Sequence, residues 1–159
     1  MLSLDDFKEQ LLGTYHNRFQ AYSNPHDFAY ITVSYWVEDD MIKSHSYHTV
    51  YGPGSAYRTN LHKLSEGSGG KILMLTYTED DPKHPCEMLF SREIIDGWWV
   101  ANNQRYELIN KGQYVNTYIA FNGVEYHSRD AGFDSVSNKL LWGKTQGQEF
   151  IFHKQSQSA

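Results

Sequence analysis

Ile-Thr-Val-Ser-Tyr-Trp-Val at residues 31–37 gives the clearest fold signal in the chain, because apolar and polar side chains follow a period of two. That period places alternate side chains on opposite faces and is typical of a β-strand with one buried face. Glu-Asp-Asp at 38–40 forms a turn signal, a second run extends over 41–51, and Gly-Pro-Gly at 52–54 stops it. The stretch predicts two antiparallel strands joined by a tight turn.

Similar short runs continue to the C-terminus, separated by turn signals. Asp96-Gly97 and Asn122-Gly123 are dipeptides suited to tight hairpin turns, and Lys111-Gly112 marks a third turn. About nine or ten short strands spaced by roughly 8–12 residues indicate an all-β antiparallel sandwich or barrel, and a barrel can hold one small ligand. The remaining strands are expected at 56–64, 71–78, 138–143 and 147–153, and 86–92 is ambiguous between strand and short helix.

One helix is expected before the strands, at residues 3–14. Ser3 can cap it, and Leu4, Phe7 and Leu11 form one apolar stripe at helical spacing. Gly13 is a suitable end. Such a helix either plugs one end of a barrel or lies against its outside.

Composition narrows the class of protein. The chain has 159 residues and a net charge of −5, which predicts a single domain over 1–159 and argues against binding to nucleic acid or acidic membranes. We find no apolar run near the ~20 residues of a membrane span and no secretory signal. One cysteine, Cys86, excludes an internal disulfide and fits a reducing compartment. A cytoplasmic protein is therefore expected.

Three apparent motifs, for phosphate binding, metal binding and a nucleophilic thiol, are not supported by the neighbouring residues. Gly143-Lys144-Thr145 imitates the end of a phosphate-binding loop, but Asn138 stands where that loop needs glycine. His45 and His48 are three apart in a strand and point to opposite faces, and the other histidines lack ligand spacing, so no metal site is expected. Cys86 follows Pro85 beside His84, and a structural thiol is favoured over a nucleophile.

Five segments in chain order resemble the T-type phycobiliprotein lyases, the CpcT/CpeT chromophore lyase family, in the short form carried by cyanophages. The segments are Gly13–Ala21, Ala56–Arg58, Ser128–Asp134, Trp142-Gly143 and Gly147–Phe152. The order is kept from end to end, with departures such as alanine in place of proline at position 56.

The resemblance implies a calycin or lipocalin-like barrel that binds a linear tetrapyrrole (bilin), phycoerythrobilin in the members named for phycoerythrin. Lyases of this kind guide the ethylidene of ring A onto a cysteine of a phycobiliprotein β-subunit and form a thioether. The bilin is the substrate, no resident cofactor is expected, and the β-subunit is the partner. Exposed Trp or Tyr on the outer face would also allow a homodimer.

The chemistry of a bilin selects the candidate site residues. Its propionates need guanidinium groups, for which Arg18 and Arg58 are candidates, since arginine pairs with carboxylate in a two-pronged way. Asp130 or Asp134 can accept pyrrole N–H bonds and act as the catalytic acid. The ligand-binding set is completed by polar Asn17 and Gln20 and by the aromatic candidates Tyr51, Tyr57, Tyr126, Trp36 and Trp142.

Structural alternatives remain open for several of these residues. Arg18 can instead pair with Asp130 or Asp134, and Asn17 and Gln20 can satisfy backbone groups. Trp142 can belong to the core. Gly132 and Gly143 are expected in turns, and strand alternation puts Ser128 and Asp130 on one face and Arg129 on the other, toward solvent if Asp130 faces the lumen.

Three functions are compatible with these residues. The first is a lyase that completes the transfer of the bilin. The second is a carrier or chaperone that binds the bilin without catalysis. The third is a barrel for another apolar ligand, such as a fatty acid.

Overall fold

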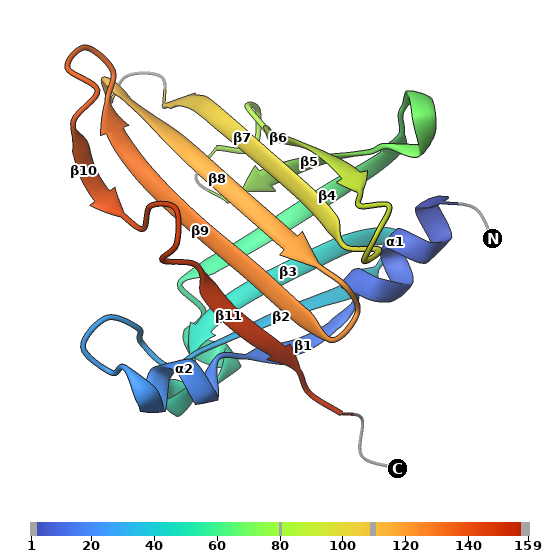
Figure 1. Cartoon of the computed structure of the whole chain (residues 1–159), viewed down its shortest axis with the longest axis horizontal. Coiled ribbons are helices and arrows are strands. Elements are labelled where there is room, and N and C mark those ends of the chain that lie inside the picture. The colour runs from blue at the N-terminus through green and yellow to red at the C-terminus, as the bar shows by residue number, and fades with distance from the viewer. Residues whose placement is uncertain (1–2, 80, 109–110, 157–159) are drawn as a thin grey trace.

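The computed structural model describes residues 3–79, 81–108 and 111–156. These residues form two helices and eleven strands, with three short 3₁₀ turns (Figure 1). The helices are α1 (Ser3–Leu11) and α2 (Arg18–Ser23), and the turns are η1 (Thr49–Tyr51), η2 (Pro53–Ser55) and η3 (Ser68–Gly70). The strands are β1 (Gly13–His16), β2 (Ile31–Glu38), β3 (Met41–His48), β4 (Arg58–Glu66), β5 (Ile72–Thr78), β6 (Cys86–Arg92), β7 (Trp99–Leu108), β8 (Gln113–Phe121), β9 (Glu125–Asp134), β10 (Leu140–Gly143) and β11 (Phe150–Lys154).

Ten of the strands close into an antiparallel barrel. The order is β9-β11-β1-β2-β3-β4-β5-β6-β7-β8, and β8 pairs again with β9. The other edge of β9 is shared, because β11 pairs with residues 125–128 and the extra strand β10 with 131–133. The expected antiparallel, calycin-like barrel with one N-terminal helix is confirmed, and closure leaves few free strand edges.

The hairpin predicted from residues 31–51 forms as β2 and β3. Ile31 pairs with His48 and Glu38 with Met41. Asp39 and Asp40 occupy the turn with φ of 55° and 62°. Two successive positive φ angles are those of a type I′ turn, which matches the twist of the strands, and aspartate tolerates them better than most residues.

The N-terminal segment differs from the prediction. The helix ends at Leu11 rather than at residue 14, because Gly13, with φ of 143°, begins a strand. The sequence did not predict β1 or α2. Four residues of Gly-Thr-Tyr-His carry no periodic signal, and β1 is a strand because it pairs with β2 and β11 on either side. The ambiguous segment 86–92 is a strand, β6.

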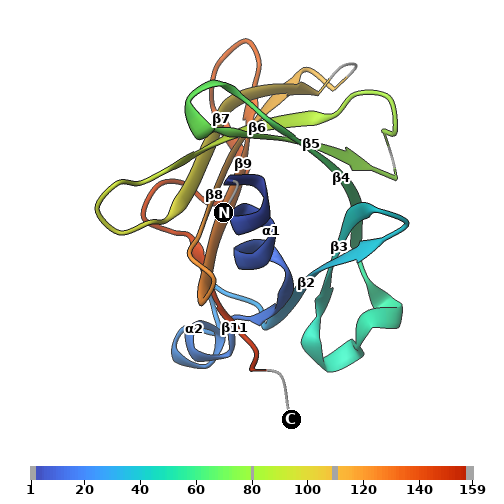
Figure 2. The same cartoon turned by 90° about the vertical axis from the view of Figure 1, so that its right-hand side faces the viewer.

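Helix α1 plugs one end of the barrel (Figure 2). Phe7 and Leu11 are fully buried, and the hydroxyl of Tyr15 donates to the carbonyl of Leu11 at 2.7 Å. The Phe7 ring meets three aromatic rings edge-on with centroids 5.0–5.2 Å away, those of Phe90, Trp99 and Phe121. The core is therefore concentrated at the helix end. None of the helices described has the length and apolarity that a membrane crossing requires.

Candidate ligand-binding site

The other end of the barrel encloses a cavity of about 320 Å³. This volume lies at the low end of the ~300–1,000 Å³ found for small-molecule sites. Strand alternation supplies its lining, because every second residue of a strand points inward. The lining residues are Val33, Tyr35, Ser44, Ser46, Arg58, Asn60, His62, Met74, Thr76, Thr78, Cys86, Met88, Tyr106, Leu108, Val115, Thr117, Ile119, Tyr126, Ser128, Asp130 and Trp142.

An ion pair spans the mouth of this cavity. Arg58 Nη1 lies 3.3 Å from Asp130 Oδ2, and the two side chains are 51% and 30% exposed. They stand on β4 and β9, which are five strands apart whichever way the ring is followed. The sequence predicted both residues as ligand contacts. A pair this exposed contributes only ~0–1 kcal/mol to stability, so a ligand carboxylate can replace Asp130 on the guanidinium at little cost.

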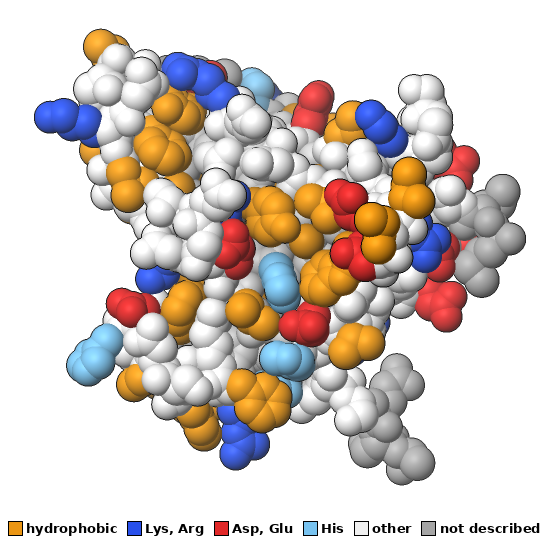
Figure 3. Space-filling view, viewed as in Figure 1, with side chains coloured by type: hydrophobic (Ala, Val, Ile, Leu, Met, Phe, Trp, Pro, Cys, Tyr) orange, Lys and Arg blue, Asp and Glu red, His pale blue; other side chains and the backbone are white. Residues whose placement is uncertain are grey.

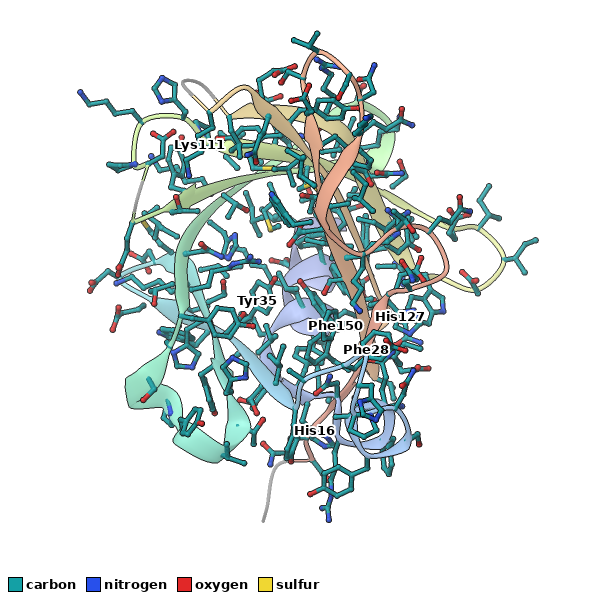
Figure 4. All side chains as sticks on the ribbon, turned by 90° about the vertical axis from the view of Figure 1, so that its left-hand side faces the viewer. His16, Phe28, Tyr35, Lys111, His127 and Phe150 are labelled. Carbon is teal, nitrogen blue, oxygen red and sulfur yellow. The ribbon has the colours of Figure 1, made fainter. Side chains whose placement is uncertain are left out.

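Deeper in the lumen, polar side chains pair with one another. The hydroxyls of Tyr35 and Tyr126 are 2.7 Å apart (Tyr35 is labelled inside the barrel in Figure 4). His62 Nε2 is 2.7 Å from Ser44 Oγ, and its Nδ1 is 2.9 Å from Thr76 Oγ1. Burial lowers the pKa of His62 to about 4 and raises the pKa of Tyr35 to about 12. Near neutral pH these groups are therefore uncharged. The sequence had predicted only Tyr126 among them.

The lumen has a polar side and a more apolar side. Strands β3, β4 and β5 contribute mostly hydroxyl, amide and imidazole groups, whereas β6, β7 and β8 contribute most of the apolar ones. Burying polar groups against an unbranched hydrocarbon chain is unfavourable. The lining suits a flat ligand that has hydrogen-bonding groups as well as apolar edges. The apolar members of the second set are Met88, Leu108, Val115 and Ile119.

Cys86 also lines the cavity. Its Sγ is 3.8 Å from Asn103 Nδ2, and burial raises the pKa of the thiol to about 11. The neutral thiol is a poor nucleophile, since the thiolate is the reactive form. Its inward position follows from alternation with Met88 on β6. The sequence of residues 86–92 fits a strand or a short helix, and only a strand places Cys86 and Met88 on the same face.

Trp142 lies at the mouth on β10, where it is 42% exposed rather than part of the core. Its Nε1 donates to Gln113 Oε1 at 3.2 Å. It pairs with Gly132 in β9, and a Cβ added at Gly132 would lie 2.2 Å from the indole ring. The prediction of Gly132 as a turn residue was wrong. The residue lies within a strand and leaves space for Trp142.

Asp134 is outside the set of described residues that line the cavity. Its Oδ1 accepts the backbone N–H groups of Val136 and Ser137 at 3.0 and 2.8 Å. These bonds lower the pKa of the carboxyl group. The carboxylate therefore organises the turn between β9 and β10, and Asp130 is the predicted carboxylate that faces the lumen.

Asn17, Arg18 and Gln20 lie around α2, away from the cavity lining. Asn17 is fully buried, where Nδ2 donates to the Ala29 carbonyl and Oδ1 accepts the N–H of Ile31, both at 2.8 Å. Gln20 bonds in the same way to Glu149 O and Ile151 N of the C-terminal segment, both at 2.9 Å. The exposed Arg18 lies over the Tyr22 ring at 5.2 Å, and Arg58 is the arginine that pairs with Asp130. Asn17 and Gln20 therefore bond to backbone groups, as the structural alternative predicted, and do not line the cavity.

The remaining aromatic candidates also lie outside the lining. Tyr51 and Tyr57 are 72% and 51% exposed, and the rings of both lie near His48. Trp36 lies on the opposite face of β2 from Tyr35, with its ring 4.7 Å from that of His45. Of the predicted aromatic walls, Tyr126 and Trp142 are the two that reach the cavity.

The expectation that Arg129 faces solvent was wrong. It lies on the opposite face of β9 from Asp130, as alternation predicts, but it is only 9% exposed. It donates to Glu149 Oε1 at 3.1 Å and to Asn116 Oδ1 at 2.8 Å, and its guanidinium lies over the Tyr118 ring. The segment that leads into β11 covers this face, so Arg129 is a structural tie rather than a solvent-facing residue.

Neither a known family model nor a curated protein sequence matches the chain. Two solved structures are similar to it. The T-type phycobiliprotein lyase CpeT from Prochlorococcus phage P-HM1 aligns over 96% of this chain and 97% of its own, with a TM-score of 0.69 and 19% identity. The CRL protein of Arabidopsis aligns over 98% and 100%, with a TM-score of 0.72 and 14% identity. Over nearly its whole length the chain therefore has the fold of a T-type phycobiliprotein lyase, the family that its sequence motifs resemble.

Proposed function

We propose that this protein binds a linear tetrapyrrole in its lumen and assists the attachment of that bilin to a cysteine of a phycobiliprotein β-subunit. Phycoerythrobilin is the expected substrate. One observation carries the proposal: the Arg58–Asp130 pair stands at the mouth of a half-polar lumen. This pair offers a partner for a propionate and a partner for pyrrole N–H groups within one barrel whose fold is that of such a lyase.

In this proposal Arg58 binds a propionate and thereby frees Asp130. The carboxylate of Asp130 then accepts pyrrole N–H bonds, and in its protonated form it acts as a general acid toward the ring system. The thiol of the acceptor adds across the ethylidene double bond, so that a C–S bond forms and the thiol proton is transferred to the bilin. No oxidant is needed. The contribution of the barrel is mainly positioning.

The acceptor protein is proposed to dock beside the mouth. Hydrophobic side chains gather at the upper left of Figure 3, where Figure 1 places β10. Exposed apolar residues of this region are Val136, Leu140, Leu141 and Trp142. Exposed apolar side chains gathered in one region of a surface are typical of a protein-binding site. Trp142 is one of these exposed residues and also lines the cavity, so a protein bound there would meet the exposed end of the bilin.

A carrier that binds bilin without transferring it is the second candidate. Asp130 is the one acidic residue in the described lining, and Arg58 neutralises it in this structure. A barrel for a fatty acid is the third candidate, and the polar side of the lumen argues against it.

Two assays separate the candidates. The protein is first mixed with phycoerythrobilin and, separately, with a fluorescent fatty acid, and bilin binding is expected to give a coloured, spectrally shifted complex. Apo-phycobiliprotein is then added, and a denaturing gel is read by zinc-enhanced fluorescence. Attached pigment above the level without the protein supports a lyase, binding without enhanced attachment identifies a carrier, and fatty-acid binding without bilin binding overturns the proposal.

A further inference from the structure

We propose that the floor of the lumen is a carbonyl-binding subsite that receives one terminal lactam ring of the bilin, so that the opposite end lies at the mouth. The inference rests on the proposed function. Its basis is a count of hydroxyl protons around two buried hydrogen-bonded groups, the Tyr35–Tyr126 pair and the cluster of Ser44, His62 and Thr76.

The tyrosine pair has two hydroxyl protons, and only one of them takes part in a hydrogen bond. Two hydroxyls 2.7 Å apart form one hydrogen bond, in which one of them donates to the other. Among the described residues neither Tyr35 nor Tyr126 has another hydrogen-bond partner for its hydroxyl. The accepting hydroxyl therefore keeps its own proton. Both residues line the cavity, and both are at least 94% buried, being 6% and 4% exposed.

The histidine cluster also has one proton to spare. A neutral imidazole carries one N–H donor and one acceptor nitrogen, so one of its two hydroxyl neighbours donates to it and the other accepts from it. Whichever tautomer His62 adopts, the hydroxyl that accepts retains its proton. In the part of the chain that the structure describes, Ser44 and Thr76 have no other side-chain partner, and both face the cavity.

The two hydrogen-bonded groups are neighbours in the lumen. The Tyr35 ring centroid is 5.3 Å from that of His62, so the tyrosine pair lies next to the histidine cluster. Buried donors favour an acceptor, and a carbonyl oxygen, with two lone pairs, can accept from both. A carboxylate would be a poorer occupant, because the guanidinium that can neutralise it stands at the mouth. A lactam carbonyl therefore fits the floor, and a propionate fits Arg58.

The cavity volume supports the same orientation. About 320 Å³ is at the low end for a small-molecule site, and a four-ring pigment is large for it. We infer that the inner half of the bilin enters the lumen and the outer half stays at the mouth. The ring with the ethylidene must be the outer one, since its nucleophile comes from another protein.

The test uses a half-bilin as the probe. A dipyrrinone with one lactam ring and one propionate is titrated into the full-length protein and followed by its visible absorption. Its lactim methyl ether, in which the carbonyl has become an ether, is titrated in parallel. The wild-type protein is expected to bind the lactam about tenfold more tightly, the size of one or two neutral hydrogen bonds.

Two sets of substitutions are each expected to reduce this preference, because each removes one of the two donors. Tyr35→Phe/Tyr126→Phe removes both phenolic hydroxyls together and leaves no unpaired partner, which limits the loss of stability. Ser44→Ala/His62→Phe/Thr76→Val removes the second group as a whole, including the imidazole N–H that loss of the hydroxyls alone would free to donate, and provides an independent test if the first variant does not fold. Tyr15→Phe is the matched control, because its hydroxyl bonds to carbonyls of α1, and it should keep the tenfold preference.

The outcomes separate this inference from the proposed function. Binding of phycoerythrobilin with an unchanged lactam preference in both variants would overturn the subsite and leave the function standing. A wild-type protein that shows no lactam preference, or that does not bind the dipyrrinone, would also overturn the subsite. A lactam preference that the variants lose supports the subsite, even if the acceptor assay shows no transfer.

Discussion

The two ends of the barrel are built from the same strands but differ in their packing. Along β6 the inward residues run from Phe90 to Met88 to Cys86. Phe90 packs against Phe7 of α1, whereas Met88 and Cys86 face a cavity. On β8 the same change runs from the fully buried Phe121 to Thr117. One pattern of alternation therefore produces a filled core at one end and a hollow lumen at the other.

This difference indicates that the helix end of the barrel stabilises the fold and that the mouth is suited to ligand binding. The aromatic cluster under α1 excludes water, and its rings bury large apolar areas. The mouth has a half-exposed ion pair and a half-exposed tryptophan, which contribute little to folding. Changes at the helix end should therefore affect the free energy of unfolding, and changes at the mouth should affect ligand affinity.

The largest effect is expected from Phe7→Ala at the helix end. Loss of a fully buried ring that contacts three other aromatic rings should lower the free energy of unfolding by about 3–5 kcal/mol. Urea unfolding measures this value. Phe19→Ala, at a side chain that is 64% exposed, is the control and should change stability by less than about 0.5 kcal/mol. Equal losses in both variants would contradict the division between the two ends.

A second test concerns the buried His62 in the lumen. Its pKa is about 4 when folded and about 6.5 when unfolded, so between these values the unfolded chain binds the extra proton. The contribution of His62 to the free energy of unfolding is fully present above pH 6.5. It should be lost progressively, by about 3 kcal/mol in total, as the pH drops to 4. In His62→Gln this part of the pH dependence should vanish. His26→Gln, at an exposed histidine, should keep it, and identical profiles for wild type and His62→Gln would contradict the burial argument.

At the mouth, Arg58→Leu should weaken bilin binding by about tenfold to a hundredfold, because a charged hydrogen bond to the propionate is lost. Arg58→Lys should be intermediate, since lysine cannot form the two-pronged pair. Absorbance titration gives the affinities, and urea unfolding should show little change in stability. Arg18→Leu on α2 is the matched control. An equal loss of affinity in Arg18→Leu would place the propionate site elsewhere.

The smallest effect is expected from Asp134→Ala. Removal of the carboxylate that accepts two backbone N–H groups should cost about 0.5–2 kcal/mol of stability, as for a lost cap. The visible spectrum of bound bilin should not change. Asp130→Asn should do the reverse and shift the spectrum without a comparable loss of stability. A spectral shift in Asp134→Ala would return that carboxylate to the pigment site.

Local sequence patterns predicted the strands well and the site in part. Period-two runs and turn dipeptides depend on neighbouring residues, and both Asp-Gly and Asn-Gly fall between paired strands. Gly97 and Gly123 have positive φ, but the loops run over 93–98 and 122–124 and are longer than the tight two-residue turns that were predicted. Arg58 and Asp130 were candidates because of their chemistry, yet their pairing across 72 residues had no local signal. Asn17 and Gln20 were as suitable chemically, but they bond to backbone groups of other segments.

The sequence by itself determined the strand periodicity, the turns, the helical stripe of α1 and the resemblance to a bilin lyase. Only the tertiary structure decided which polar side chains share the lumen, that Gly132 makes room for Trp142, and that Arg129 is covered by the segment leading into β11. The physical reason is the separation in sequence over which each interaction acts. Backbone preference and alternation act between residues a few positions apart, whereas a cavity is defined by strands that meet only when the barrel closes.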